Sequence, residues 1–241
     1  MLAGLIAVLL LVACIPREAE VEIGAPPGRV PDEDAERSYS CFSRPYPESV
    51  WSEQRPAEDV DHPGRETLLA ELGEEDLAGW FVLEASDERL SVARELAEPR
   101  NDGFRQTHDI VGIVLHNRQW KLEQWSSCVP RLAIEGFGDA ELSLAAPPAP
   151  DSTDIELLVT EVACASGRDA TGRVRVVALD ERSDAVHVIV GLVPNRGDHT
   201  CPSNPATPFT LTLSEPLGDR ELVNAAVWPP TPLEVAPALH D

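Results

Sequence analysis

Lysine is almost absent from the chain, since Lys121 is the only one, and acidic residues outnumber basic residues by 42 to 19. The resulting net charge of −23 argues against nucleic-acid binding, because a phosphate backbone requires a basic footprint. It also argues against electrostatic adhesion to an anionic bilayer. We therefore expect any contact with a membrane to come from something other than side-chain charge.

The sequence also lacks the short motifs that mark common catalytic and cofactor sites. It contains no Gly-x-Ser-x-Gly elbow, no Ser-x-x-Lys, no His-Glu-x-x-His, no Cys-x-x-Cys and no glycine-rich phosphate loop. We assign no catalytic residue, no metal ligand and no cofactor. A hydrolase without a motif stays open, because a catalytic triad is recognised by geometry rather than by spacing.

No apolar run approaches the roughly 20 residues that a membrane-spanning helix requires. The run from Leu2 to Val12 has eleven residues, which fits the core of a signal peptide. It leads into Leu11-Val12-Ala13-Cys14, which resembles the lipobox of bacterial lipoproteins. The resemblance implies that residues 1–13 are removed and that Cys14 carries a diacylglycerol. Two acyl chains give stable anchoring, at about 0.8 kcal/mol per buried methylene.

One feature departs from the usual signal peptide, because no Lys or Arg precedes the apolar run. Either the amino-terminal ammonium supplies the positive charge or the start codon lies upstream. The alternatives to lipidation are an ordinary secretory signal and a short buried strand that happens to precede a cysteine.

Composition divides the chain into five expected segments. Residues 1–13 form the signal peptide, and residues 14–40 form a lipidated, disordered acidic tether, because prolines, glycines and carboxylates replace any apolar periodicity. Residues 41–146 form an N-terminal domain with short helices and strands. Residues 147–150 form a stiff proline-rich linker, and residues 151–235 form a C-terminal β domain.

Two short helices are expected in the N-terminal domain. The first covers 65–72, where leucines share a face and Gly73 can end the helix. The second runs from about Ser86 to Ala97 and stops before Pro99.

The rest of the pattern predicts strands, because apolar residues alternate with polar ones or form short continuous runs. Ile110 to Leu115 is such a run, which is typical of a strand buried on both faces. Further strands are expected near 119–125, 132–134, 142–144, 155–163, 173–179, 185–193 and 208–214. We predict a mainly β protein of antiparallel sandwich-like or barrel-like domains with short helices, with α+β possible in the N-terminal half.

Four cysteines remain when Cys14 is set aside, and an even number in an exported chain predicts two disulfides. Three pairings are possible. The proline linker favours Cys41–Cys128 and Cys164–Cys201, because this pairing keeps each bridge inside one domain.

Six histidines raise the question of a metal site or an acid–base pair. His108 and His116 flank the apolar run, and the two imidazoles would meet if the strand folded back. Eight residues is not a familiar ligand spacing, however, and polar residues are expected at the ends of an apolar strand. We expect His187 to face solvent, because it alternates with valines in its strand.

The segment from Cys201-Pro202 through the Thr/Leu strand to Pro216-Leu217-Gly218-Asp219-Arg220 resembles the C-terminal part of small, uncharacterised secreted proteins and lipoproteins of actinobacteria. The resemblance covers about residues 155 to 230. It implies an exported, disulfide-bonded domain and transfers no activity.

These features favour a cell-envelope lipoprotein that serves as a non-enzymatic binding or assembly module. Its expected partners are the membrane, through the lipid on Cys14, and a protein or cell-wall component. The alternative is an envelope hydrolase that acts on cell-wall glycan or peptide, which requires two carboxylates about 5–10 Å apart in a groove or converging histidines. A weaker third hypothesis is cation binding by the acidic segment, which lacks the spacing of a calcium loop.

Overall fold

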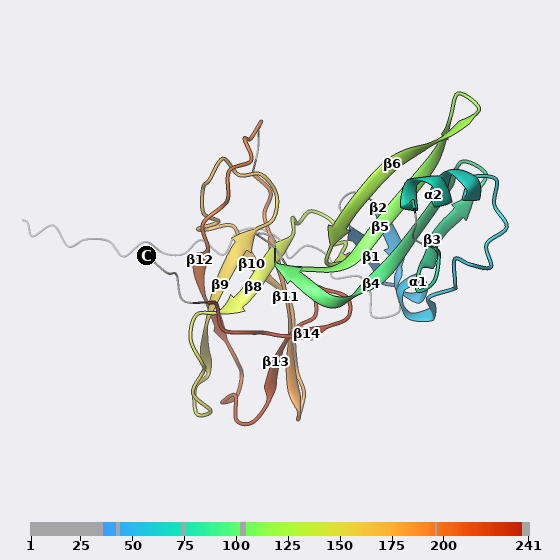
Figure 1. Ribbon diagram of the computed structural model, residues 1–241. Helices are drawn as coiled ribbons and strands as arrows, with labels where there is room; N and C mark the ends of the chain where they lie inside the picture. The colour runs from blue at the N-terminus through green and yellow to red at the C-terminus, as the bar shows by residue number, and fades with distance from the viewer. Residues whose placement is uncertain (1–35, 42–43, 74–75, 102–104, 196, 238–241) are drawn as a thin grey trace, which may run out of the picture.

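The computed structural model describes residues 36–41, 44–73, 76–101, 105–195 and 197–237. Strands make up 49% of the structure and helices 7%, so the fold is mainly β, as predicted. The strands form four sheets, and none of them closes into a barrel within the described residues. Figure 1 shows that the sheets form two lobes, with both helices in the lobe that comes first in the sequence.

The N-terminal lobe is built on a four-stranded antiparallel meander. Its strands follow one another in sequence and in space: β3 (Phe81–Ser86), β4 (Arg89–Asn101), β5 (Arg105–His116) and β6 (Gln119–Cys128). Helix α2 (Arg65–Leu72) covers one face, where its buried Leu68 and Leu72 belong to the same apolar cluster as Val111 and Ile113 of β5. β5 is buried on both faces from His108 to Ile113, which confirms the predicted buried run for Ile110 to Ile113, whereas Leu115 at the end of that run is exposed.

A small sheet covers the other face of the meander. It consists of β1 (Ser38–Cys41), β2 (Arg44–Pro47) and β7 (Arg131–Leu132), and β2 leads directly into helix α1 (Glu48–Glu53). Trp51 of α1 is fully buried, and its ring meets Phe81 of β3 edge-on at a centroid distance of 6.0 Å.

The C-terminal lobe is a two-layer β-sandwich. One layer has the order β12-β9-β8 and the other the order β10-β11-β13-β14, and aliphatic side chains from both fill the space between them. All neighbouring strands are antiparallel except β11 and β13, which are parallel. The strands are β8 (Ala140–Leu144), β9 (Asp154–Glu161), β10 (Val174–Glu181), β11 (Ala185–Leu192), β12 (Thr207–Thr212), β13 (Glu221–Asn224) and β14 (Thr231–Pro232).

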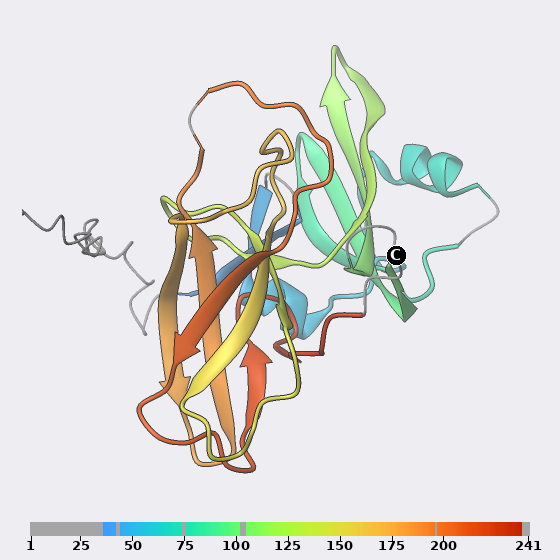
Figure 2. The same ribbon diagram turned by 90° about the vertical axis from the view of Figure 1, so that its left-hand side faces the viewer.

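The two lobes share an apolar core. Ile189 of β11 and the pair Ala225–Ala226 after β13 lie in one cluster with Tyr39, Trp51 and other residues of the N-terminal lobe. Arg131 of β7 forms a β-bridge with Val227, and the Tyr39 and Trp228 rings lie 5.4 Å apart. The view in Figure 2 shows the segment after β13 (red) lying against the N-terminal lobe.

Helix α2 has the predicted bounds, but the helix expected from Ser86 to Ala97 is wrong. β3 ends at Ser86, and β4 covers the remaining residues from Arg89 onward. Leu90, Ala93 and Ala97 have helical spacing, yet Leu90 through Ala93 are all buried because β4 lies between β3 and β5. Pairing on both edges outweighs the local helical pattern.

The segment boundaries also differ from those expected. β1 begins at Ser38, inside the range 14–40 expected to be a disordered tether, and Tyr39 is buried. β8 precedes the expected linker 147–150 but pairs with β9 in the sandwich. The proline-rich residues therefore connect two neighbouring strands of one sheet, and the C-terminal lobe starts at β8.

Candidate functional site

Both disulfides favoured by the sequence are present in the structure. Cys41–Cys128 ties β1 to the end of β6, with the Cα atoms 5.8 Å apart. Cys164–Cys201 ties the loop after β9 to the loop before β12, with the Cα atoms 4.5 Å apart. Each bridge lies within one lobe. Cys14, the expected lipid-attachment residue, lies outside the described residues.

His108 and His116 do not converge. Both lie on β5, which continues without folding back, so eight residues at about 3.3 Å each place them roughly 26 Å apart. His108 is 1% exposed, whereas His116 is exposed at the end of the strand. The hypothesis of a histidine pair is therefore wrong.

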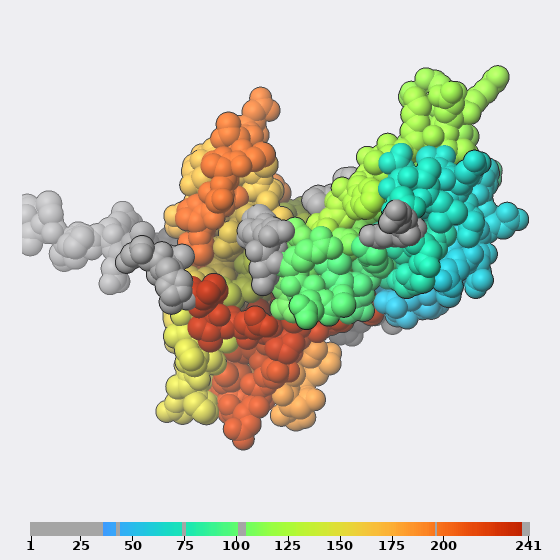
Figure 3. Space-filling model, in the orientation of Figure 1, coloured from blue at the N-terminus to red at the C-terminus, as the bar shows by residue number. Residues whose placement is uncertain are grey.

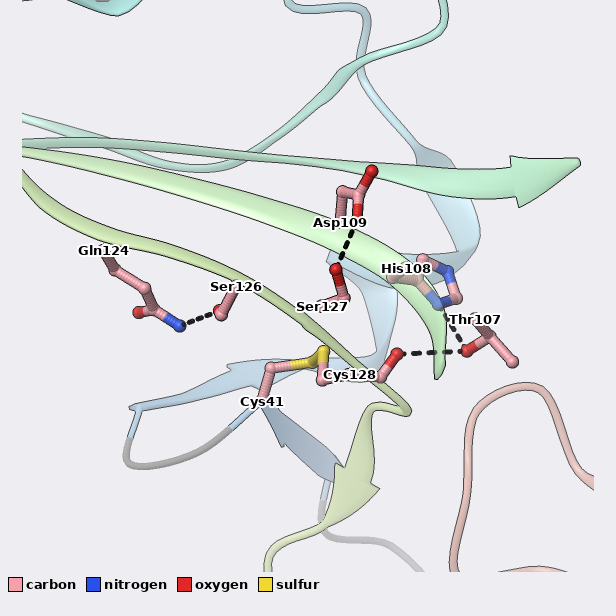
Figure 4. The surroundings of a disulfide bond; sticks show 8 residues. All are labelled: Cys41, Thr107, His108, Asp109, Gln124, Ser126, Ser127 and Cys128. Atoms are coloured by element: carbon pink, nitrogen blue, oxygen red, sulfur yellow. Dashed lines mark hydrogen bonds between the residues drawn. A yellow bond between two sulfur atoms is a disulfide. The ribbon is translucent and has the colours of Figure 1, made fainter. Parts of the chain in front are cut away.

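His108 is instead a buried core histidine. Its ring meets Trp51 edge-on at a centroid distance of 5.5 Å, and its Nδ1 lies 2.9 Å from the Thr107 hydroxyl. Figure 4 shows the same hydroxyl reaching the Cys128 carbonyl beside the disulfide. Burial lowers the pKa of His108 to about 4, although the neighbouring Asp109 opposes this shift. The imidazole is therefore neutral at pH 7 and has a structural role.

Asp109 points to the opposite face of β5 and is held as a carboxylate. Arg94 and Arg100 place guanidinium nitrogens 3.1 and 3.0 Å from it, and the Ser127 hydroxyl donates a hydrogen bond of 2.6 Å. Burial alone would raise the pKa of Asp109, but the Ser127 hydrogen bond and the two guanidinium groups outweigh burial and lower it. Such a fully paired carboxylate stabilises the sheet rather than transferring protons.

A hollow lies where the two lobes meet. Its volume is about 400 Å³, within the range of ligand-binding pockets. Figure 3 shows the C-terminal residues (red) between the two lobes at this junction. We call this hollow the junction groove, and we define it by Arg105, Val129, Leu142, Asn224, Trp228 and Val235.

The backbone of β8 leaves one residue unpaired at the groove. Ala145 donates to the Glu156 carbonyl of the β9 side, and Val162 donates to the Asp139 carbonyl, so odd-numbered residues of β8 bond toward β9. The backbone N–H and C=O groups of the even-numbered residues therefore point away from β9. Leu144 bonds outward to Glu234 and Ala236, but within the described residues no hydrogen bond reaches the outward N–H and C=O of Leu142.

The hydrogen bonds of the residues on either side of Leu142 explain why its outward N–H and C=O have no partner. On one side the Ala140 carbonyl accepts a 2.8 Å hydrogen bond from the Arg131 guanidinium. On the other side, residues Glu234 to Ala236 pair with Leu144 of β8. The preceding residue, Leu233, does not continue this pairing to Leu142, because its N–H donates to the Leu222 carbonyl instead. Leu142 therefore presents one free donor and one free acceptor between two occupied positions.

Asn224, at the end of β13, contributes a second free donor. It is 7% exposed, and its Oδ1 accepts a 3.0 Å hydrogen bond from the Ala226 N–H. Its Nδ2 has no hydrogen-bond partner within the described part of the chain, yet it is not sealed from solvent. A buried amide with free N–H groups at a cavity wall is a typical ligand contact.

The two carboxylates of the junction groove both have cationic partners. Glu141 forms an ion pair with Arg131, and Glu234 lies 3.5 Å from Arg105. Neither glutamate has the apolar, unpaired surroundings that glycoside hydrolysis requires of its acid.

An exposed apolar stripe lies outside the groove, on the hairpin of β5 and β6. Leu115, Leu122 and Trp125 are three of the five large apolar side chains that the described residues leave exposed. Their register places all three on the face of the meander that α2 covers in part.

In the described ranges, no group of three or more potential metal-ligating side chains is close enough to hold an ion. None of the helices described has the length and apolar character needed to cross a bilayer.

No model of a known protein family matches the chain, and neither a curated protein nor a solved structure matches it. The resemblances noted in the sequence therefore stay predictions.

Sequence reasoning missed the junction groove and both of its free hydrogen-bonding residues. Leu142 was expected to lie in a strand, but which of its edges is free depends on where Glu234 to Ala236 lies. Asn224 follows Leu222 and Val223 in a short strand. A polar amide after two apolar strand residues was the one local feature of the sequence that could have indicated a functional role for Asn224.

Proposed function

We propose that the chain is an extracytoplasmic lipoprotein, anchored by a diacylglycerol on Cys14 at the outer face of the cytoplasmic membrane. In this proposal it binds a protein or cell-wall partner in the junction groove and catalyses no reaction. The lipobox resemblance and the two disulfides support the location, because disulfides persist in oxidising compartments.

The observation that carries the binding role is the groove itself. It combines an apolar wall containing Val129, Val227 and Trp228 with hydrogen-bonding groups that the fold leaves free at Leu142 and Asn224. A hollow that is mainly apolar and has a few convergent polar groups is the usual form of a binding site. His108 is buried away from the groove, and the groove's two glutamates, Glu141 and Glu234, are paired with arginine.

A photo-crosslinking experiment in the producing cells tests this proposal. A benzophenone amino acid replaces Val235 at the rim of the groove, and the matched control carries it at Val176 on β10. The two valines are 42% and 38% exposed, so the crosslinker is about equally accessible from solvent at both positions. The proposal predicts a discrete adduct at Val235 that is absent at Val176. Equal labelling at both positions, or no adduct at either, would contradict it.

A further inference from the structure

The free groups of the junction groove resemble the exposed edge of a β-sheet. Leu142 offers an N–H donor and a C=O acceptor from the same residue, both directed away from β9. In a strand, this is the pair of groups through which one residue bonds to a neighbouring strand. An extended peptide carries the complementary pair on every second residue, whereas an aliphatic ligand has no hydrogen-bonding groups to offer.

The chain itself shows what fits at this edge. The segment Glu234 to Ala236 already pairs with Leu144, two residues further along β8, through one bond in each direction. This pairing is parallel. It does not extend to Leu142, because the chain just before Glu234 forms β14, which pairs with β13 instead. The edge at Leu142 is thus a position next to a natural strand contact, left open over the groove.

Asn224 supplies an independent observation. Its side chain faces the inside of the sandwich on the same side of β13 as Leu222, and Ala226 fixes its Oδ1. The Nδ2 donors are therefore held in one orientation and are open to an acceptor from outside the chain. A peptide carbonyl is such an acceptor.

We infer that the ligand of the junction groove is an extended polypeptide segment. One of its residues pairs with the N–H and C=O of Leu142, and a carbonyl accepts from Asn224 Nδ2. An apolar side chain of the peptide packs beside Val129, Val227 and Trp228. This inference rests on the proposed binding function and specifies its ligand class.

Amide hydrogen exchange on the full-length, membrane-extracted protein tests the inference at the atom concerned. In the free protein, the Leu142 amide should exchange quickly although its side chain is buried, while the Leu144 amide, bonded to Glu234, exchanges slowly. The probe is a pool of pentapeptides, acetylated and amidated, with threonine at both ends and three random central residues. At millimolar concentration it should slow the exchange of Leu142 by about tenfold or more.

The chemical control is the same pool N-methylated at all five residues, which keeps the side chains and removes the residue N–H donors from both edges. It should leave the exchange of Leu142 unchanged. The protein variant is Asn224→Asp, which keeps the acceptor for Ala226 and loses the donors, and we expect peptide affinity to fall about tenfold. Asn195→Asp, which makes the same charge change outside the groove, should leave the affinity unchanged.

Slow exchange of Leu142 in the free protein would overturn the inference, since the edge would not be free. Equal effects of the two pools would also overturn it. If Val235 yields an adduct in cells while no peptide protects Leu142, the binding function stands and the ligand is of another class. If Val235 yields no adduct, the binding function falls as well.

Discussion

The imidazole of His108 is buried among aromatic rings in the shared core of the two lobes. Its neighbour Asp109 lies on the other face of the strand, with Arg94, Arg100 and Ser127. Because burial removes water from the ring, folding favours the neutral imidazole and lowers the pKa of His108.

This burial predicts that acid destabilises the fold before the carboxylates titrate. The unfolded chain takes up a proton on His108 near pH 6.5, whereas the folded chain resists protonation until about pH 4. Stability from this residue is complete above pH 6.5 and is lost as the pH falls through that window, by about 3 kcal/mol. Urea unfolding at pH 7.5 and at pH 4.5 measures the difference.

His108→Phe should remove most of this pH dependence, because phenylalanine keeps the edge-on ring contacts and cannot be protonated. His116→Phe is the control, since His116 is exposed and its substitution should leave the pH dependence intact. A wild-type free energy of unfolding that is equal at both pH values would show that the imidazole is not buried in this way.

Residue types alone could not identify the role of each histidine. The strand around His108 was predictable, and so was the burial of its apolar neighbours, because Ile110 to Leu115 is a continuous apolar run. The aromatic surroundings were not, since Trp51 and Phe81 come from distant parts of the chain. The same limit applies to Asn224, whose free amide is visible only once β8 and β13 face each other.

At the scale of elements, prediction succeeded where local pattern and tertiary contacts agree. Helix α2 has leucines on one face and ends at Gly73, whose φ of +71° suits glycine. β12 alternates a core-facing side and a threonine side, as its sequence indicates. Prediction failed at β4, where helical spacing competed with pairing on both strand edges.

The packing of α2 gives a test at this scale. Leu68→Ala should reduce the free energy of unfolding by about 2–5 kcal/mol, because Leu68 is fully buried between α2 and the meander. Leu69→Ala, on the same helix, should cost clearly less, since Leu69 is only partly buried. Equal losses in urea titrations of the two variants would contradict the packing of α2 on this face.

At the scale of the whole molecule, the two lobes depend on one core. The cluster that contains Tyr39 and Trp51 also contains Ile189, Ala225 and Ala226 from the sandwich. The junction groove exists because this core joins the end of the sandwich to the meander. The proline-rich segment suggested two separate domains, but it could not reveal that β8 belongs with β9.

The shared core predicts a single unfolding transition with both disulfides intact. Separating the lobes would expose apolar side chains from both sides, so neither lobe is expected to survive loss of the other. Differential scanning calorimetry should give equal calorimetric and van't Hoff enthalpies. Two resolved transitions would show that the lobes unfold independently and that the groove is not a fixed feature.

The proposed role depends on export, and the intact mass of the protein extracted from membranes after blocking of free thiols tests it most directly. The account predicts a chain that begins at Cys14, carries a diacylglyceryl group, and has no blocked thiol on Cys41, Cys128, Cys164 or Cys201. A cytosolic chain with residues 1–13 retained and these four thiols blocked would contradict it.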